Sequence, residues 1–381
     1  MRKIKIGMLL FASVWLLAAC SGNPFSSDSD PEPTEDASAV QSSEPSEAPS
    51  ELPEDGLDSK LPSPYEGMAR SPLTNEWIDE EKAKIRPIAV MTPNESNALP
   101  QYALSQASVL YEAPVEGFMS RLLAIYEDWQ DLEKIGNIRS LRTYYTYWAF
   151  EWDAFIIHCG HPFYVDDLIA LPDTQTINEA NYVDSIAFYR DESRPMPHNA
   201  FATGQGILDA IGKKGYSLEY RGLADQPHFT FAEDSSPNTL RQYGDSAQTA
   251  VYIDLSGCYP LTRCYFDYNE AEGLYYRYQH LSGGPDGPHT DASGQQLAFQ
   301  NILVQYVKAE DLGGGYYAFQ CSDDTEDGWF FTRGLGIHVT WKKSDDYGAT
   351  KFYDDLGNEI ELNTGKTMIC VAIKGDKFTF R

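Results

Sequence analysis

Basic residues are scarce in this chain of 381 residues, which has 29 Lys and Arg against 57 Asp and Glu and a formal net charge of -28. Binding of nucleic acid depends on Lys and Arg that neutralise phosphates, and broad attraction to anionic lipids depends on basic segments. The charge balance therefore argues against nucleic acid as a partner and against unspecific adhesion to anionic surfaces.

Long apolar runs are missing after the first 20 residues. The N-terminus places Arg2, Lys3 and Lys5 before one apolar stretch that ends in L-A-A-C at Cys20. This is the arrangement of a secretory signal peptide over 1–20, too short to span a bilayer comfortably. The ending resembles the bacterial lipobox, which implies cleavage and acylation of Cys20, with palmitate among the expected lipids. We therefore expect a protein anchored by lipid to the bacterial cell membrane and facing the outside of the cytoplasm, with a simple cleaved signal as the alternative.

Large apolar side chains are also rare in residues 21–60, which consist mainly of Ser, Pro, Glu and Asp. Such a segment cannot bury enough apolar surface to offset its ordering entropy, so we predict a disordered acidic tether over 21–75. In the remainder of the chain, the spacing of apolar residues changes partway along. We expect an α/β or α+β domain with a mixed sheet over 76–240, and a mainly antiparallel β domain over 241–381.

The first of these domains alternates strand-like and helix-like runs. Strands are expected over 87–91, 109–112, 120–126 and 153–159, and helices over 140–152, 164–171 and 204–214. From about residue 249 the helical period disappears, and short β-branched or aromatic runs recur between Gly, Asp and Asn turns.

Cysteine is sparse, and the five residues beyond Cys20 are Cys159, Cys258, Cys264, Cys321 and Cys370. Pairs between Cys258 and Cys264 and between Cys321 and Cys370 are open alternatives, while Cys159 is expected to be a buried free thiol. The chain has no paired C-x-x-C spacing, and H-C-G-H at 158–161 lacks the rest of a ligand set. We therefore predict no metal site and no cofactor.

Familiar catalytic signatures are absent as well, including G-x-S-x-G, H-E-x-x-H, a Walker loop and S-x-x-K. The most unusual polar cluster is I-G-N-I-R-S-L-R, in which Arg139 and Arg142 flank Ser140. A helix beginning near Ser140 would add its positive dipole end to the two guanidinium groups, a combination suited to a carboxylate or phosphate.

Other polar residues are expected near this cluster. His158 should lie at the carboxyl end of a strand, where ligands gather in α/β sheets, and His198 with Asn199 lies in the proline-stiffened loop R-P-M-P-H-N. The ligand-binding candidates are therefore Arg121, Arg139, Ser140, Arg142, His158, His198 and Asn199.

Glu112 and Glu116 share one strand face if Pro114 does not break the register. Two carboxylates on one face could be an acid/base pair, or they could be countercharges for the arginines. Asp191, which precedes the R-P-M-P-H-N loop, belongs to the same group of acid/base or countercharge candidates.

Several motifs occur in an order that points to a family. R-P-I-A-V-M from Arg86, Y-E-A-x-V-E-G from Tyr111, I-G-x-I-R-S-x-R, D-A-F-I-I-H and R-x-x-P-H-N resemble the YerB-like bacterial lipoproteins, domain of unknown function 3048, and G-x-G-x-H-V-x-W resembles the C-terminal domain of that family. The resemblance implies a lipoprotein with a two-domain extracytoplasmic part, but no reaction. Asn137, Leu141 and Met368 depart from the family pattern.

Three functions are compatible with these features. The first is a binding lipoprotein that holds an anionic cell-envelope ligand, such as a cell-wall fragment, or an envelope protein, in an Arg/His-lined cleft. The second is a hydrolase or transferase acting on the cell wall, with Glu112, Glu116 or His198 as acid or base. The third is a structural or partner-protein module in which the same charges form an internal network.

Overall fold

The computed structural model describes residues 65–223, 227–281 and 286–381. The predicted signal peptide, Cys20 and the predicted tether up to residue 64 lie outside the described residues. Among the helices that are described, none is both long enough and apolar enough to cross a membrane.

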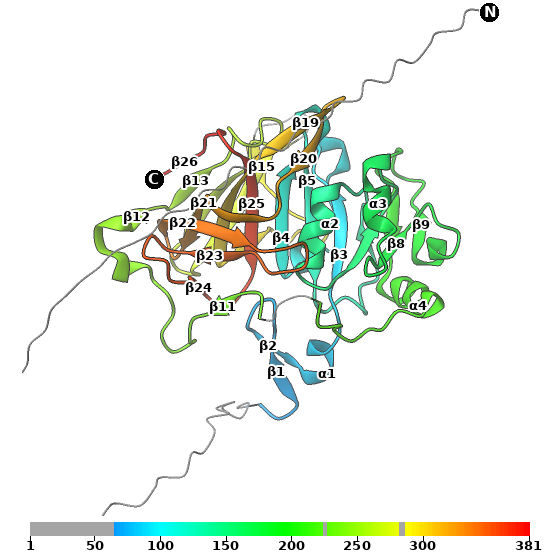
Figure 1. The fold of residues 1–381 in the computed structure, drawn as a ribbon, viewed down its shortest axis with the longest axis horizontal. Coiled ribbons are helices and arrows are strands. Elements are labelled where there is room, and N and C mark those ends of the chain that lie inside the picture. The colour runs from blue at the N-terminus through cyan, green and yellow to red at the C-terminus, as the bar shows by residue number, and fades with distance from the viewer. Residues whose placement is uncertain (1–64, 224–226, 282–285) are drawn as a thin grey trace, which may run out of the picture. The chain divides into compact units, whose positions relative to one another are not determined.

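A mixed sheet of 11 strands organises the fold, in the order β12-β22-β21-β18-β25-β4-β5-β3-β7-β8 with β23 paired to β22 (Figure 1). Its strands are β3 (Ile88–Pro93), β4 (Val109–Pro114), β5 (Ser120–Tyr126), β7 (Phe155–His158), β8 (Thr176–Asn178), β12 (Gln248–Thr249), β18 (Asn301–Val307), β21 (Asp323–Thr332), β22 (Leu335–Lys343), β23 (Lys351–Tyr353) and β25 (Thr367–Ile373).

This sheet runs across the predicted boundary at residue 240. β18 pairs in parallel with β25, and β25 pairs in parallel with β4, so strands from both predicted domains form one continuous layer. The prediction of a mainly antiparallel C-terminal part missed these two parallel pairings. A buried parallel strand is a short apolar run like any other, and its partner lies too far along the chain for the sequence pattern to reveal it.

A second sheet of six strands has the order β16-β15-β14-β13-β26, with β17 paired to β15. Its strands are β13 (Tyr252–Asp254), β14 (Tyr265–Asn269), β15 (Leu274–His280), β16 (Asp286–Pro288), β17 (Ala298–Phe299) and β26 (Thr379–Phe380). Smaller sheets consist of β1 (Met68–Arg70) with β2 (Trp77–Asp79), β6 (Ile135–Gly136) with β10 (Ala200–Ala202) and β9 (Phe188–Arg190), β11 (Thr230–Phe231) with β24 (Glu361–Leu362), and β19 (Ala309–Gly313) with β20 (Tyr316–Phe319).

The helices are short. The α-helices are α1 (Glu80–Ala83), α2 (Thr143–Phe150), α3 (Asp166–Ile169) and α4 (Gly204–Lys214). The 3-10 turns are η1 (Ser96–Ala98), η2 (Leu104–Gln106), η3 (Glu116–Phe118), η4 (Phe163–Val165), η5 (Asp184–Ala187) and η6 (Arg241–Ser246). α4 has the bounds predicted for it, because Thr203 caps its N-terminus by accepting from the Gly206 N–H and Gly215 ends it in the left-handed conformation.

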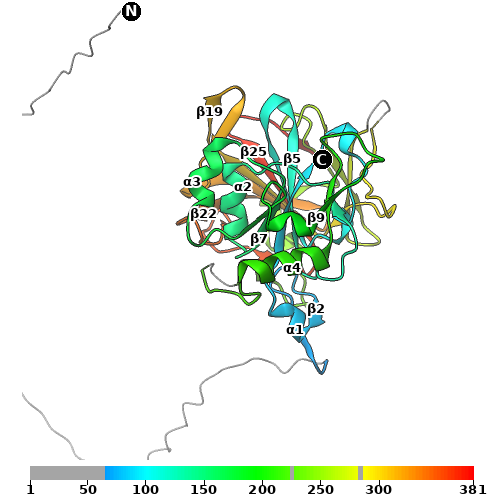
Figure 2. The same ribbon diagram turned by 90° about the vertical axis from the view of Figure 1, so that its right-hand side faces the viewer.

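Both faces of the large sheet are covered, which gives the fold two cores. Along β3 and β5, alternate residues such as Val90 and Leu122 pack toward the six-stranded sheet and α4, while Met91 and Leu123 pack toward α2. Figure 2, turned by 90° from Figure 1, shows α2 and α4 at well-separated places on this part of the fold. The strands in the middle of the sheet are consequently apolar on both faces.

Three predicted strands, 87–91, 109–112 and 153–159, differ from β3, β4 and β7 by one or two residues at their ends, and two predicted helices differ more. The predicted helix over 140–152 begins only at Thr143, and the predicted helix over 164–171 consists of η4 followed by the four residues of α3. The predicted tether also extended too far. Met68–Arg70 forms β1, and Ser71 and Leu73 are buried, so the prediction of disorder up to residue 75 is wrong for its last part.

The five cysteines beyond Cys20 are all free thiols. The two pairings that spacing left open are therefore not formed. Cys159 is free as predicted but is only partly buried, and burial is the main cause that raises its pKa to about 11.

Candidate functional site

The carboxyl edge of the large sheet gathers most of the predicted site residues. β3, β4 and β7 run in the same direction, and the antiparallel β5 begins where β4 ends. The extended segment 139–141 lies between the ends of β3 and β7, because the Arg139 N–H donates to the Met91 carbonyl at 2.8 Å and the Leu141 N–H donates to the Gly160 carbonyl at 3.1 Å. The backbone thus brings the I-R-S-L-R motif to the edge expected for ligands.

This same backbone pairing overturns one prediction. Ser140 does not begin a helix, since α2 starts at Thr143 and its N-cap residue, Arg142, makes no side-chain capping bond. The hydroxyl of Ser140 donates to the Cys159 carbonyl at 3.0 Å. The helix therefore begins one residue after Arg142, and Ser140 belongs to the extended segment that precedes it.

Arg142 and Glu116 form the tightest ion pair of this edge. The Nε of Arg142 donates to one carboxylate oxygen of Glu116 at 3.0 Å, and its Nη2 contacts the other oxygen. Arg121 adds a longer contact, 3.8 Å from its Nη2 to Glu116, and donates to the Ser140 carbonyl at 2.6 Å. Burial acts to raise the pKa of Glu116, but Arg142 and Arg121 outweigh it and lower that pKa, so Glu116 is anionic at neutral pH.

A looser group lies beside this pair. Glu95, which follows β3, has one carboxylate oxygen 4.0 Å from Arg139 Nη2 and 3.6 Å from His198 Nε2. Both distances exceed a normal hydrogen bond. Burial, reinforced by Arg139, lowers the pKa of His198 in spite of Glu95. His198 is therefore mainly neutral near pH 7.

Several buried nitrogen atoms at this edge have no hydrogen-bond partner among the described residues. They are the Nε donors of Arg121 and Arg139 and the Nδ1 atom of His198, which donates or accepts according to the tautomer of the ring. An unsatisfied buried polar group costs about 1–3 kcal/mol, so such groups are uncommon in a purely structural network.

A hollow of about 180 Å³ opens next to Glu95. Its lining residues are Asn94, Glu95, Ser96, Met119, Ser120, Leu261, Thr262 and His280. Arg139 and Glu95 each keep 19% of their side chains exposed and Glu116 keeps 23%, whereas Arg121 is almost fully buried. The accessible part of the edge is thus formed by Arg139, Glu95 and Glu116.

Glu112 does not belong to this cluster, although it lies on β4 only four residues before Glu116. Its carboxylate pairs with Arg277 at 2.6 Å, both side chains being fully buried, and also accepts from Ser120 and Asn94. Burial opposes the charge of Arg277, yet Glu112 and nearby thiols raise the pKa of the guanidinium. The predicted sharing of one face by Glu112 and Glu116 fails because Glu116 lies in η3, outside the strand.

The remaining candidates have other surroundings, although His158 ends β7 at the same edge and its Nε2 has no partner among the described residues. His158 is fully buried and faces the Gly160 carbonyl at 2.9 Å, and burial lowers its pKa to about 4. Asn199 accepts from Arg190 at 2.9 Å. Asp191 pairs with Lys134 at 2.7 Å, and hydrogen bonds from Lys134 and Ser193 lower its pKa. The structure therefore brings together only part of the predicted set.

Sequence reasoning missed three residues that shape this region. Arg277 lies on the same strand face as the buried Tyr275, a position that signals a buried cation needing a partner. Glu95 lies two residues after the buried strand β3, near the edge of the sheet where ligands commonly bind. Arg194 donates to the carbonyls of Ala98, Leu99 and Pro100 at 2.8–3.0 Å and so fixes the start of the loop that carries His198.

Within the described ranges, no three residues among His, Cys, Asp and Glu approach closely enough to hold a metal ion. His158 and His161 do lie near each other, with ring centres 5.5 Å apart. The acceptor nearest His161 is Asp166, at 3.0 Å.

Comparison with known proteins gives consistent matches. The model of the family described as "Protein of unknown function (DUF3048) N-terminal domain" matches residues 73–217, and that of the corresponding C-terminal domain matches residues 257–369. The chain is 31% identical over 239 residues to the Bacillus subtilis (strain 168) protein called "Putative lipoprotein YerB", an alignment that covers 62% of this chain and 66% of that protein. The fold matches the crystal structure of YerB from Bacillus subtilis with a TM-score of 0.68 and 23% identity, over 82% of this chain and 99% of that one.

Proposed function

This chain belongs to the DUF3048 family of proteins of unknown function, and from that premise we propose that it is a binding lipoprotein of the cell envelope. Lipid on Cys20 would hold it to the membrane with the folded part outside the cytoplasm. The name of the Bacillus subtilis relative supports the lipoprotein assignment. The carboxyl edge of the sheet would bind an anionic group of a cell-wall fragment.

The observation that carries this proposal is an imbalance of charge. Within the part of the chain that the structure describes, three cations, Arg121, Arg139 and Arg142, contact two carboxylates, Glu95 and Glu116. Glu112 cannot correct the imbalance because Arg277 occupies it. One positive charge therefore remains at this edge of a strongly acidic protein, and an anionic ligand would neutralise it.

The two halves of the cluster have different parts in this proposal. Arg142 and Glu116 are already bound to each other through two contacts, so they would position the edge. Arg139 donates from Nη1 to the Pro197 carbonyl at 3.3 Å, but its Nη2 and the Nε2 of His198 lie beyond hydrogen-bond distance from Glu95, which leaves these two atoms available. A ligand carboxylate entering from the hollow beside Glu95 would receive a charge-assisted bond from Arg139 and a neutral one from His198.

Isothermal titration of the full chain in detergent micelles tests this role, with muramyl dipeptide and its carboxamide form as probes. We expect the acid to bind, the amide to bind at least tenfold more weakly, and Arg139→Ala and His198→Ala each to weaken binding of the acid about tenfold. Lys84→Ala is the control because Lys84 pairs with Glu80 and Glu81 on α1, which precedes the amino end of β3, whereas the cluster lies at the carboxyl end of that strand. Equal affinity of all four proteins for the acid would remove Arg139 and His198 from the role.

A further inference from the structure

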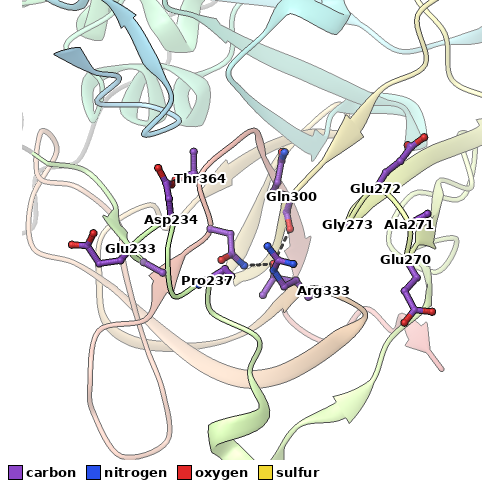
Figure 3. A pocket seen from close by; sticks show the side chains of 13 residues that line it. Glu233, Asp234, Pro237, Glu270, Ala271, Glu272, Gly273, Gln300, Arg333 and Thr364 are labelled. Carbon is purple, nitrogen blue, oxygen red and sulfur yellow. Dashed lines mark hydrogen bonds between the residues drawn. The ribbon is translucent and has the colours of Figure 1, made fainter. Parts of the chain in front are cut away.

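A second region of hollows lies at the opposite edge of the large sheet, where β18 and β25 begin and the β21–β22 hairpin turns. One hollow of about 280 Å³ is lined by Glu233, Asp234, Glu270, Glu272, Gln300 and Arg333, among others. A neighbouring hollow of about 410 Å³ shares Glu270 and Arg333 and adds Arg241. Figure 3 shows Arg333 beside Gln300, between the wall that carries Asp234 and the wall formed by Glu270 to Gly273.

Arg333 occupies a position that its turn does not favour. Thr332 pairs with Leu335, so Arg333 and Gly334 form a two-residue hairpin loop with φ of 50° and 76°. Loops with two positive φ values strongly favour Asn, Asp or Gly at the first position. The turn is held from outside, since the Gly334 N–H donates to the Tyr275 hydroxyl at 3.1 Å. A turn that is fixed and yet carries Arg at its strained position suggests a use for the side chain.

The charges lining these hollows are incompletely paired. Neither Arg333 nor Arg241 forms an ion pair or a side-chain hydrogen bond with any residue that the structure describes, although the chain has a net charge of -28. Glu270 lines both hollows with Arg333 but does not pair with it. Asp234, by contrast, is occupied by Arg70 and Thr364.

We propose that these hollows bind a zwitterionic peptide. Its carboxylate would lie on Arg333 and Arg241, and its ammonium group on Glu270. The carboxylates along the walls would repel a purely anionic ligand, and a purely cationic one would leave the two arginines without a countercharge. A peptide with both charges satisfies the two sets together. This site is separate from the carboxyl-edge cluster and does not rest on the function proposed for it.

The test is isothermal titration of the full chain at low salt with the tetrapeptide Lys-Ala-Ala-Glu. We expect Arg333→Asn and Arg241→Ala each to weaken binding at least fivefold. Lys213→Ala is the matched control, because it removes an exposed charge from the last turn of α4. Equal binding by the wild type and both arginine variants overturns the proposal, and so does inorganic phosphate that binds more tightly than the peptide in an Arg333-dependent way.

A second measurement separates this role from a structural one. Asn suits the strained turn position, so Arg333→Asn should raise the thermal unfolding midpoint while it weakens peptide binding. A lower midpoint for Arg333→Asn, with peptide binding reduced in proportion to the loss of folded protein, would show that the arginine serves the fold and would overturn the proposal.

Discussion

The interior network around Glu112 and the edge cluster around Glu116 start from the same residue type, four positions apart in one short stretch. Glu112 is fully buried, pairs with the fully buried Arg277 and accepts further bonds from Ser120 and Asn94. Glu116 keeps 23% of its side chain exposed and contacts two arginines, Arg121 and Arg142. Glu112 thus has one buried countercharge, whereas arginines outnumber carboxylates at the edge, and this difference is the basis for proposing the edge as a binding site.

Removing Arg277 should have the largest effect. Arg277→Ala leaves the Glu112 carboxylate buried without its countercharge, which costs about 3–5 kcal/mol. Urea denaturation followed by tryptophan fluorescence measures the loss in unfolding free energy. Adding Glu112→Leu to Arg277→Met should recover part of the loss, because an apolar pair carries no uncompensated charge. A loss below about 1 kcal/mol for Arg277→Ala would contradict the view that the interior charges are mutually dependent.

A fall in pH should test the effect of His158, which lies at the same edge of the sheet but is fully buried. Burial lowers the pKa of His158 to about 4 from an ordinary value of 6.5. The unfolded chain therefore binds more protons than the folded one between these values, so His158 makes stability fall as pH drops below 6.5, by roughly 3 kcal/mol when pH 4 is reached. Denaturation curves from pH 7 to 4 measure this, and His158→Gln should flatten them. An unchanged slope in that variant would assign the acid sensitivity to other groups.

Breaking the edge pair should cost less than breaking the interior one. Arg142→Ala removes two contacts to Glu116, but water and Arg121 can still reach the carboxylate, so we expect a loss of about 1–2 kcal/mol in unfolding free energy. The pKa of Glu116 is lower in the folded protein than its ordinary value. Its contribution to the unfolding free energy is therefore present at neutral pH and is lost as pH falls through the pKa of the folded state. If Arg142→Ala cost as much as Arg277→Ala, the distinction between the two regions would disappear.

The smallest change concerns a cation that has no partner among the described residues. Arg333→Asn relieves the positive φ of the hairpin turn and breaks no ion pair, so it should stabilise the protein by about 0.5–1 kcal/mol. Differential scanning calorimetry against Arg333→Ala, which keeps the strain but removes the charge, separates relief of strain from loss of charge. Equal midpoints for the two variants would show that strain is not the cause.

Local patterns were sufficient for much of the fold. The strand over 120–126 and the helix over 204–214 have the predicted bounds, because seven consecutive residues buried on both faces and a capped helix are properties of short segments. The start of α2 was predicted too early because the N–H groups of Arg139 and Leu141 donate to the carbonyls of Met91 and Gly160. Those partners lie far away in the chain, and no pattern within the motif identifies them.

The sequence by itself determined the strongly acidic charge, the family, and the placement of arginines and His198 in motifs that end at one edge of the sheet. Only the tertiary structure decided which charge meets which. Arg277 is 165 residues from Glu112 in the chain and yet is its partner, whereas Glu116 pairs with Arg142, which is 26 residues away. The reason is physical: hydropathy and turn preferences act over a few residues, whereas an ion pair depends on two side chains that a continuous sheet has brought together.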